Sequence, residues 1–129
     1  MVVDASALLE VLLRTSGAAL VEQRLFADGE TLHAPHLIDI ETAQVLRRYA
    51  AGDEIDGARG RAALDDLADF PLRRYPHDLL LPRVWDLRHD LTAYDAVYVA
   101  LAEMLDATLL TRDRRLAAAS GHRARIDLV

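Results

Sequence analysis

The sequence of 129 residues contains no cysteine, and every one of its 15 permanently charged basic residues is arginine. Without cysteine there is no disulfide and no thiolate metal site, which is compatible with a reducing cytoplasm. The absence of lysine excludes a Walker A phosphate loop and Schiff-base chemistry, because both need a lysine side chain. Several classes of enzyme are therefore excluded before any motif is considered.

Long hydrophobic runs are also missing. No apolar stretch approaches the roughly 20 residues that cross a bilayer, and no basic segment precedes an apolar one at the start. We therefore expect a soluble, cytoplasmic protein that does not enter a membrane. The formal net charge of −6 argues against general nucleic-acid binding, which depends on a net basic surface. Bound divalent cations would offset part of that charge at an enzyme site.

Short apolar runs alternate with longer helical patterns along the chain. Hydrophobic residues make up 52 % of the composition, enough for a globular core. Strands are predicted at about 1–4, 31–34, 71–75, 107–111 and 126–128, and helices at about 5–14, 17–27, 36–51, 55–68, 78–88, 93–105 and 113–119. This alternation favours βαβ units and a parallel sheet in an α/β fold. With no repeat or linker, residues 1–129 are predicted to form one domain.

Four acidic residues occupy positions where a lone carboxylate is costly. Asp4 and Asp113 each follow an apolar run that is predicted to be a strand. Asp95 opens an apolar helix, and Glu41 interrupts the apolar stripe of another. Carboxylates are seldom buried unless they are paired or bind a metal. If the first and fourth strands are neighbours, these acids meet at one sheet edge, where hard oxygen ligands favour Mg²⁺ or Mn²⁺.

Each acid also has a structural alternative. Asp4 and Asp113 precede predicted helices, and an aspartate N-cap stabilises a helix by about 1 kcal/mol. Thr92 and Asp95 have the spacing of a capping-box variant. Glu41 has many arginines available for a salt bridge. If all four roles are structural, the chain is a non-catalytic protein-interaction module.

The residues around the acids match a known pattern. The chain contains, in this order, Val2-Val3-Asp4-Ala5-Ser6, Leu37-Ile38-Asp39-Ile40-Glu41, Leu91-Thr92-Ala93-Tyr94-Asp95-Ala96 and Thr111-Arg112-Asp113-Arg114-Arg115-Leu116. In the order and spacing of these motifs it resembles the PIN-domain nucleases and, within them, the VapC-type toxins of bacterial toxin–antitoxin pairs. The resemblance extends over nearly the whole chain.

The resemblance implies a three-layer α/β/α fold with a mostly parallel central sheet, and a Mg²⁺- or Mn²⁺-dependent endoribonuclease. It implies a VapB-like antitoxin that occludes the site, and a toxin homodimer. Ser6 and Thr111 match family hydroxyls that hold a carboxylate or a metal-bound water. By position, the family's catalytic and metal-binding acids are Asp4, Glu41, Asp95 and Asp113.

Three arginines, Arg112, Arg114 and Arg115, flank the fourth acid. They are candidates for RNA binding, because arginine neutralises phosphates. The alternative for this triplet is a solvated helix face.

Two other enzyme classes share part of the pattern. A phosphohydrolase of the haloacid-dehalogenase type also carries an aspartate after its first strand. That chemistry needs a second aspartate two residues on, where this chain has Ser6, and a lysine that the chain lacks. A DNA-directed nuclease with the same acids is a further alternative, because carboxylates and a metal do not distinguish the sugar.

Apolar residues suggest partner surfaces as well. Four leucines supply more apolar area than one helix face usually buries, so part of this surplus is predicted to form a dimer seam or a groove for an antitoxin helix. The alternative is core packing on two sides. Trp85 is predicted to lie in the core or a partner interface, with a base-stacking platform as the alternative. The five histidines are predicted in surface or capping positions. The leucines are Leu8, Leu9, Leu12 and Leu13, and the histidines are His33, His36, His77, His89 and His122.

Overall fold

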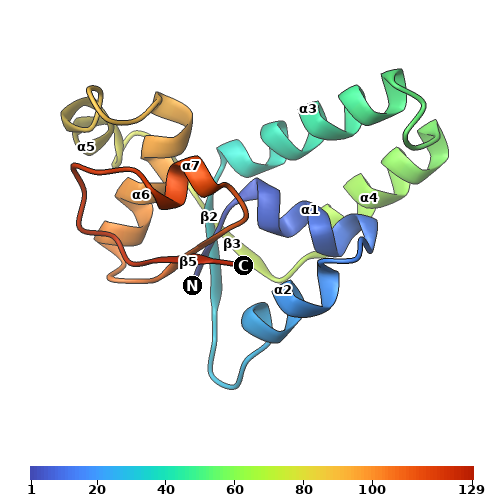
Figure 1. Ribbon diagram of the computed structural model, residues 1–129, viewed down its shortest axis with the longest axis horizontal. Helices are drawn as coiled ribbons and strands as arrows, with labels where there is room; N and C mark the ends of the chain where they lie inside the picture. Colours follow the sequence, from blue (N-terminus) through green and yellow to red (C-terminus); the bar gives the residue numbers. More distant parts are fainter.

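The centre of the molecule is a sheet of five parallel strands, seen in a computed structural model that describes residues 1–129. The strands are β1 (Val2–Val3), β2 (Leu32–Pro35), β3 (Leu72–Tyr75), β4 (Leu109–Thr111) and β5 (Ile126–Leu128). They lie in the order β3-β2-β1-β4-β5, with helices on both faces (Figure 1). The expected three-layer fold is confirmed, and the sheet is parallel throughout.

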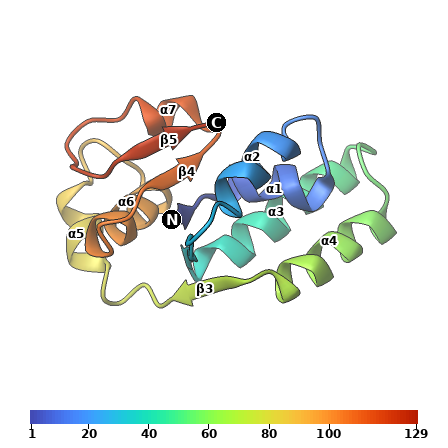
Figure 2. The same ribbon diagram turned by 90° about the horizontal axis from the view of Figure 1, so that it is seen from below.

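Seven helices connect and flank the strands. They are α1 (Ala5–Leu13), α2 (Ala18–Leu25), α3 (Leu37–Ala51), α4 (Gly57–Asp69), α5 (Leu81–Asp86), α6 (Ala93–Met104) and α7 (Arg114–Ala117). One face of the sheet is covered by α6, with α5 packed against it. The other face is covered by α1, around which α2, α3 and α4 are arranged (Figure 2). None of these helices combines the length and the apolar character that a membrane span needs.

The pairing of β1 with β4 decides where a site can form. In register, Val2 lies beside Leu109, and Val3 lies beside Leu110. From β1 the chain moves outward through β2 to β3 and then returns to the other side of β1 with β4. The strand order therefore reverses between β1 and β4. In such sheets the connections that leave the two strands diverge and open a crevice at the carboxyl ends.

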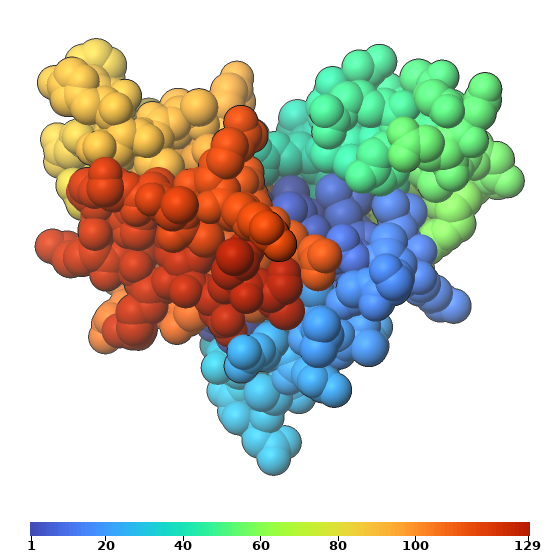
Figure 3. Space-filling view, in the orientation of Figure 1, coloured from blue at the N-terminus to red at the C-terminus, as the bar shows by residue number.

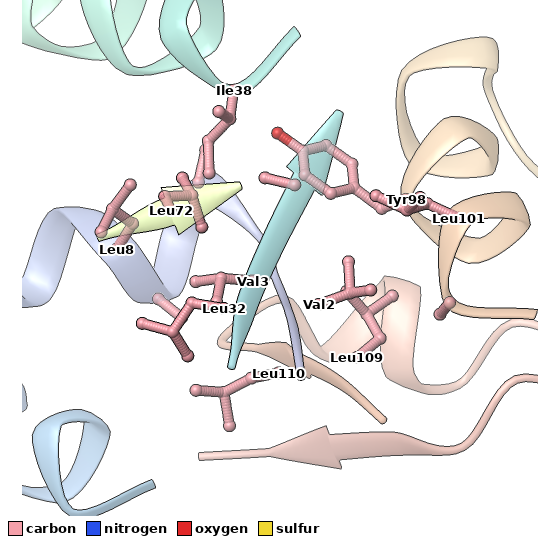
Figure 4. Packing of buried hydrophobic residues seen from close by; sticks show 14 of the residues in the cluster. Val2, Val3, Leu8, Leu32, Ile38, Leu72, Tyr98, Leu101, Leu109 and Leu110 are labelled. Atoms are coloured by element: carbon pink, nitrogen blue, oxygen red, sulfur yellow. The ribbon is translucent and has the colours of Figure 1, made fainter. Parts of the chain in front are cut away.

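Alternation along the central strands divides the core between the two faces. Val2 and its neighbour Leu109 lie on the side of α6, whereas Val3 and Leu110 lie on the side of α1 (Figure 4). All four side chains are fully buried. Because a strand points successive side chains to opposite faces, two-residue apolar runs are enough to bind both helical layers to the sheet.

Two expectations about apolar surfaces are corrected here. On α1, Leu8, Leu9 and Leu12 are buried, so core packing on two sides accounts for these three leucines, and Leu13 is the one that is only partly buried. Trp85 of α5 is 67 % exposed, so the prediction that it lies in the core is wrong. Leu79 and Leu81 are also exposed, which leaves an apolar surface at α5.

An ion pair between a buried carboxylate and a partly exposed arginine joins α6 to α5. The side chain of Glu103 is 3 % exposed and accepts hydrogen bonds from Arg83 Nε at 2.7 Å and Arg83 Nη2 at 3.1 Å. The backbone N–H of Arg123 donates a further bond to it at 2.9 Å. The hydrogen bond from Arg83 lowers the pKa of Glu103, although burial acts in the opposite direction. Because α6 also carries Asp95, this pair helps to set the position of an acid at the other end of the helix.

We expect Glu103→Gln to lower the free energy of unfolding by about 1 to 3 kcal/mol, because charge-assisted hydrogen bonds are lost and Arg83 keeps no charged partner. The pKa of Glu103 is lower in the folded than in the unfolded state, so this stabilisation is present at neutral pH and is lost as the pH falls through the folded-state value. Urea unfolding at neutral pH measures the loss.

The matched control is Asp65→Asn, which breaks the exposed pair between Arg61 and Asp65. It should cost at most about 0.5 kcal/mol, as is usual for such pairs within one helix. Equal losses in the Glu103 and Asp65 variants would contradict a stabilising role for the buried pair.

Candidate active site

All four acids line one pocket at the carboxyl-terminal edge of the sheet. Asp4 follows β1 and Asp113 follows β4, while Asp95 lies in the first turn of α6 and Glu41 in the second turn of α3. The pocket has a volume of about 720 Å³ and extends between α1 and α3. In Figure 3 the blue residues of the N-terminal segment lie at the bottom of a hollow between the orange C-terminal segment and the green α3.

Two hydroxyl groups hold the side chain of Asp4, which is 9 % exposed. Asp4 Oδ2 accepts hydrogen bonds from Ser6 Oγ and from Thr111 Oγ1, both at 2.6 Å. Asp4 occupies the N-cap position of α1, but its side chain makes no capping hydrogen bond, so the capping alternative is wrong for this residue. Its second oxygen, Oδ1, accepts no hydrogen bond from the protein.

Backbone N–H groups fix the direction of both hydroxyls. The N–H of Arg112 donates to Ser6 Oγ at 2.9 Å. The N–H of Asp113 donates to Thr111 Oγ1 at 2.9 Å. Because an ionised carboxylate can only accept, the proton of each hydroxyl is directed to Asp4 Oδ2. The loop after β4 is thereby attached to the end of β1 through the carboxylate.

Asp113 combines its place in the pocket with a capping role. Its Oδ1 accepts hydrogen bonds from the backbone N–H groups of Arg115 at 2.7 Å and Leu116 at 3.4 Å. The capping alternative is therefore confirmed for Asp113. Capping occupies Oδ1 alone and leaves Oδ2 without a hydrogen bond in the protein.

Glu41 is half-buried and meets a tyrosine instead of an arginine. No arginine forms an ion pair with it, so the salt-bridge alternative is wrong. Its Oε2 accepts a hydrogen bond from the hydroxyl of Tyr98 at 2.5 Å. Burial raises the pKa of Glu41; the hydrogen bond from Tyr98 lowers it, and the charges of Asp4 and Asp95 raise it again.

Asp95 experiences the same kind of repulsion. Burial raises its pKa, and the charges of Asp113 and Asp4 raise it further, whereas the hydrogen bond with Thr92 and the charge of Arg115 lower it. The backbone N–H of Asp95 donates to Thr92 Oγ1 at 3.2 Å, which confirms Thr92 as the cap of α6. As the side chains stand, no three acidic or histidine residues form a group that could hold a metal ion. The carboxylates share one pocket but do not form a closed coordination shell.

The three arginines around Asp113 differ in their surroundings. Arg112 lines the pocket, and its Nε lies 3.2 Å from Glu10 Oε1 of α1 in an ion pair. Arg115 is almost fully exposed, with its Nε 3.9 Å from Asp113 Oδ1. Arg114 is exposed and forms no ion pair. A solvated helix face therefore describes Arg114 and Arg115, whereas Arg112 is attached to α1.

Away from the acids, the pocket becomes a groove between two helices. From α1, Leu9 and Leu13 line it, and from α3, Leu37, Ile40 and Val45. Polar side chains of α3 complete this part of the wall: Gln44, Arg48 and Tyr49. The groove thus joins an acidic end near the sheet to a largely apolar arm.

Comparison with known proteins agrees with this arrangement. A family model described as the PIN domain matches residues 1–121. Ribonuclease VapC1 of Mycobacterium tuberculosis is 46 % identical over 129 residues, which cover 99 % of this chain and 96 % of that protein. PAE2754 from Pyrobaculum aerophilum superposes with a TM-score of 0.69 at 29 % identity, over 98 % of this chain and 82 % of that one.

A second solved structure, VapBC2 from Rickettsia felis bound to a DNA fragment from their promoter, has the same fold. Its TM-score is 0.73 at 11 % identity, over 99 % of this chain and 97 % of that one. The fold, the order of the motifs and the identity to VapC1 agree with one another. The chain belongs to the PIN-domain family and, within it, to the VapC-type toxins.

Proposed function

We propose that this protein is the toxin of a toxin–antitoxin pair and that it hydrolyses RNA as a Mg²⁺- or Mn²⁺-dependent endoribonuclease. The observation that supports this most directly is the gathering of four carboxylates in one pocket. The chain also resembles, over nearly its whole length, a relative that is named as a ribonuclease. The proposed catalytic and metal-binding residues are Asp4, Glu41, Asp95 and Asp113.

The donor atoms of this pocket suit a hard divalent cation. The acids offer carboxylate oxygens, which Mg²⁺ and Mn²⁺ prefer, and the chain has no thiolate. Burial and, after it, repulsion from the neighbouring acids raise the pKa of Glu41 and of Asp95, and a cation among the carboxylates would offset that repulsion. Asp4, Asp95 and Asp113 would hold the cation directly or through water. Glu41 would be a further ligand or would orient the attacking water.

When bound, the cation lowers the pKa of a water and offsets negative charge on the phosphate and the leaving oxygen. The protein's own groups supply orientation. Ser6 and Thr111 hold the Asp4 carboxylate through hydrogen bonds. Arg112, Arg114 and Arg115 lie beside the site and would neutralise RNA phosphates. In-line attack would leave a 5′-phosphate and a 3′-hydroxyl.

Asp4→Asn tests the catalytic proposal. The asparagine Oδ1 can still accept from Ser6 and Thr111, so the fold should be retained, but the carboxylate charge is lost. We expect cleavage of a single-stranded RNA in Mn²⁺ to fall by more than about 100-fold, the upper end of the loss seen when a partner of a metal ligand is removed. Gel analysis of an end-labelled RNA measures the rate.

Asp106→Asn is the matched control, because Asp106 precedes β4 at the opposite edge of the sheet and is exposed. It should cleave like the unmodified protein. Full activity in Asp4→Asn would refute the assignment. Cleavage of a DNA oligonucleotide of the same sequence would favour the DNA-directed alternative. The haloacid-dehalogenase alternative is wrong, because the chain is a PIN-domain protein in which Ser6 donates to Asp4.

The electrostatics predict how pH and metal affect stability. The pKa of Glu41 is higher in the folded than in the unfolded state, so the folded state binds more protons and is destabilised as the pH rises through that interval. Without metal, Glu41→Gln should therefore gain stability relative to the unmodified protein as the pH is raised from the acidic range to neutral. Thermal unfolding in EDTA measures this difference.

At neutral pH, Mn²⁺ at 100 times its dissociation constant should stabilise the unmodified protein by about 2.7 kcal/mol. The same Mn²⁺ concentration should stabilise Glu41→Gln less. A protein that Mn²⁺ leaves unchanged would support the non-catalytic interaction module, whose acids serve only as caps and ion-pair partners.

A VapB-like antitoxin is the partner that we propose for the groove. A solved neighbour of the same fold is named as a VapBC pair. The apolar arm between α1 and α3 is open and leads directly to the acids. An antitoxin segment with apolar residues at helical spacing would cover Leu13, Ile40 and Val45. A chain seated there would also block RNA from reaching the carboxylates.

A homodimer is proposed as well, and α5 offers the exposed surface for it. With the core excluded for Trp85, a partner interface and a base-stacking platform remain, and we propose the partner interface. We expect Trp85→Ala to raise the dimer dissociation constant about 30-fold, as is typical when a tryptophan at the centre of an interface is removed. Leu20→Ala, which changes an exposed leucine of α2, is the control. Sedimentation that shows a monomer in the unmodified protein, or equal dimerisation in all three, would contradict this surface.

A further inference from the structure

The geometry points to Tyr98 as a positioning residue that holds the Glu41 carboxylate in the pocket. This inference rests on the proposed metal-dependent nuclease activity and adds a residue to its site. Tyr98 does not line the pocket and is therefore not a ligand. Its hydroxyl donates to Glu41 Oε2 at 2.5 Å, which leaves Oε1 without a hydrogen bond in the protein.

The ring of Tyr98 is fixed by its surroundings. Tyr98 is 1 % exposed and belongs to the hydrophobic core. In Figure 4 the ring lies beside β2 and its hydroxyl is directed towards the start of α3, where Ile38 is labelled. A buried tyrosine with one hydrogen-bond partner has few alternative rotamers. The hydroxyl therefore offers a donor at a defined point.

Glu41 needs such a donor because the other charged groups that act on it are carboxylates, which repel it. Asp4 and Asp95 carry the same charge and act on it across the pocket. No arginine pairs with it, and the hydrogen bond from Tyr98 is the one that its carboxylate accepts. A glutamate side chain also has three rotatable bonds, and its outward rotamers would relieve the repulsion. The tyrosine hydroxyl opposes that movement.

The position of Tyr98 also links two elements of the site. Tyr98 lies three residues after Asp95 on α6, so both project from one side of this helix. Glu41 lies on α3, which belongs to the layer on the opposite face of the sheet. One helix thus supplies an acid of its own and the group that orients an acid from the other layer.

Tyr98→Phe tests this role, because phenylalanine fills the same core space and removes only the donor. We expect the Mn²⁺ dissociation constant, measured from the metal dependence of thermal unfolding, to rise about 10- to 100-fold. At saturating Mn²⁺, the kcat for RNA should fall while KM stays within about twofold, because the RNA contacts are unchanged. Tyr75→Phe is the control. It removes the hydroxyl that lies 2.9 Å from His33 Nδ1, two strands away from Asp4, and should alter neither quantity.

A second variant keeps the test open if Tyr98→Phe does not fold. Glu41→Asp retains the charge and the tyrosine but shortens the side chain, so its carboxylate cannot reach the hydroxyl from the same backbone position. Mn²⁺ affinity should fall in this variant too. Unchanged affinity and kcat in Tyr98→Phe, or in Glu41→Asp where the first variant is unfolded, would overturn the inference. If the unmodified protein neither binds Mn²⁺ nor cleaves RNA, the proposed function itself fails.

Discussion

The site depends on a single carboxylate oxygen, Asp4 Oδ2. It accepts hydrogen bonds from two hydroxyls, and these lie at the ends of two different strands. Ser6 follows β1 and Thr111 ends β4, so both bonds exist only because these strands are neighbours in the sheet. Parallel pairing brings their carboxyl ends to the same edge, and the reversal of strand order opens a crevice there. The loop with Asp113 is then attached through its own backbone N–H. The remaining acids, Glu41 and Asp95, lie on α3 and α6, which begin at that edge.

Buried carboxylates are treated in two different ways in this chain. Glu103 is nearly inaccessible and is matched by a guanidinium and a backbone N–H, which is how a purely structural acid is stabilised. In the pocket, Glu41 and Asp95 are left to repel Asp4, and only hydroxyls and one exposed arginine act against that repulsion. Fifteen arginines were available in the sequence to neutralise them. This unneutralised charge supports the proposal that the pocket binds a cation.

Much of the fold and most of the site can be predicted from local patterns. Asp4 and Asp113 stand out because each follows an apolar run, and Glu41 because it lies on an apolar helix stripe; all three line the pocket. Tyr98 could not be assigned in the same way, because periodicity predicts that a residue is buried but not which polar atom its hydroxyl will meet. The prediction that Trp85 lies in the core is wrong for a related reason. Helical spacing indicates a shared face, but whether another element covers that face depends on tertiary packing, and none covers it here.

The outermost strand β5 is coupled to the pocket more closely than its distance along the chain suggests. Leu128 is paired with Thr111 in the sheet, and the backbone N–H of Val129 donates to the carbonyl of Thr111 at 3.1 Å. Like β3, β5 has a neighbour on one side only, so it is one of the two strands that separate most easily from the sheet. Fraying of these final residues would break the hydrogen bond to the backbone of Thr111. Because the hydroxyl of Thr111 holds Asp4, the side chain of Asp4 would then be less restrained. The pairing of β5 with β4 thus helps to hold Thr111, one of the two residues whose hydroxyls orient Asp4.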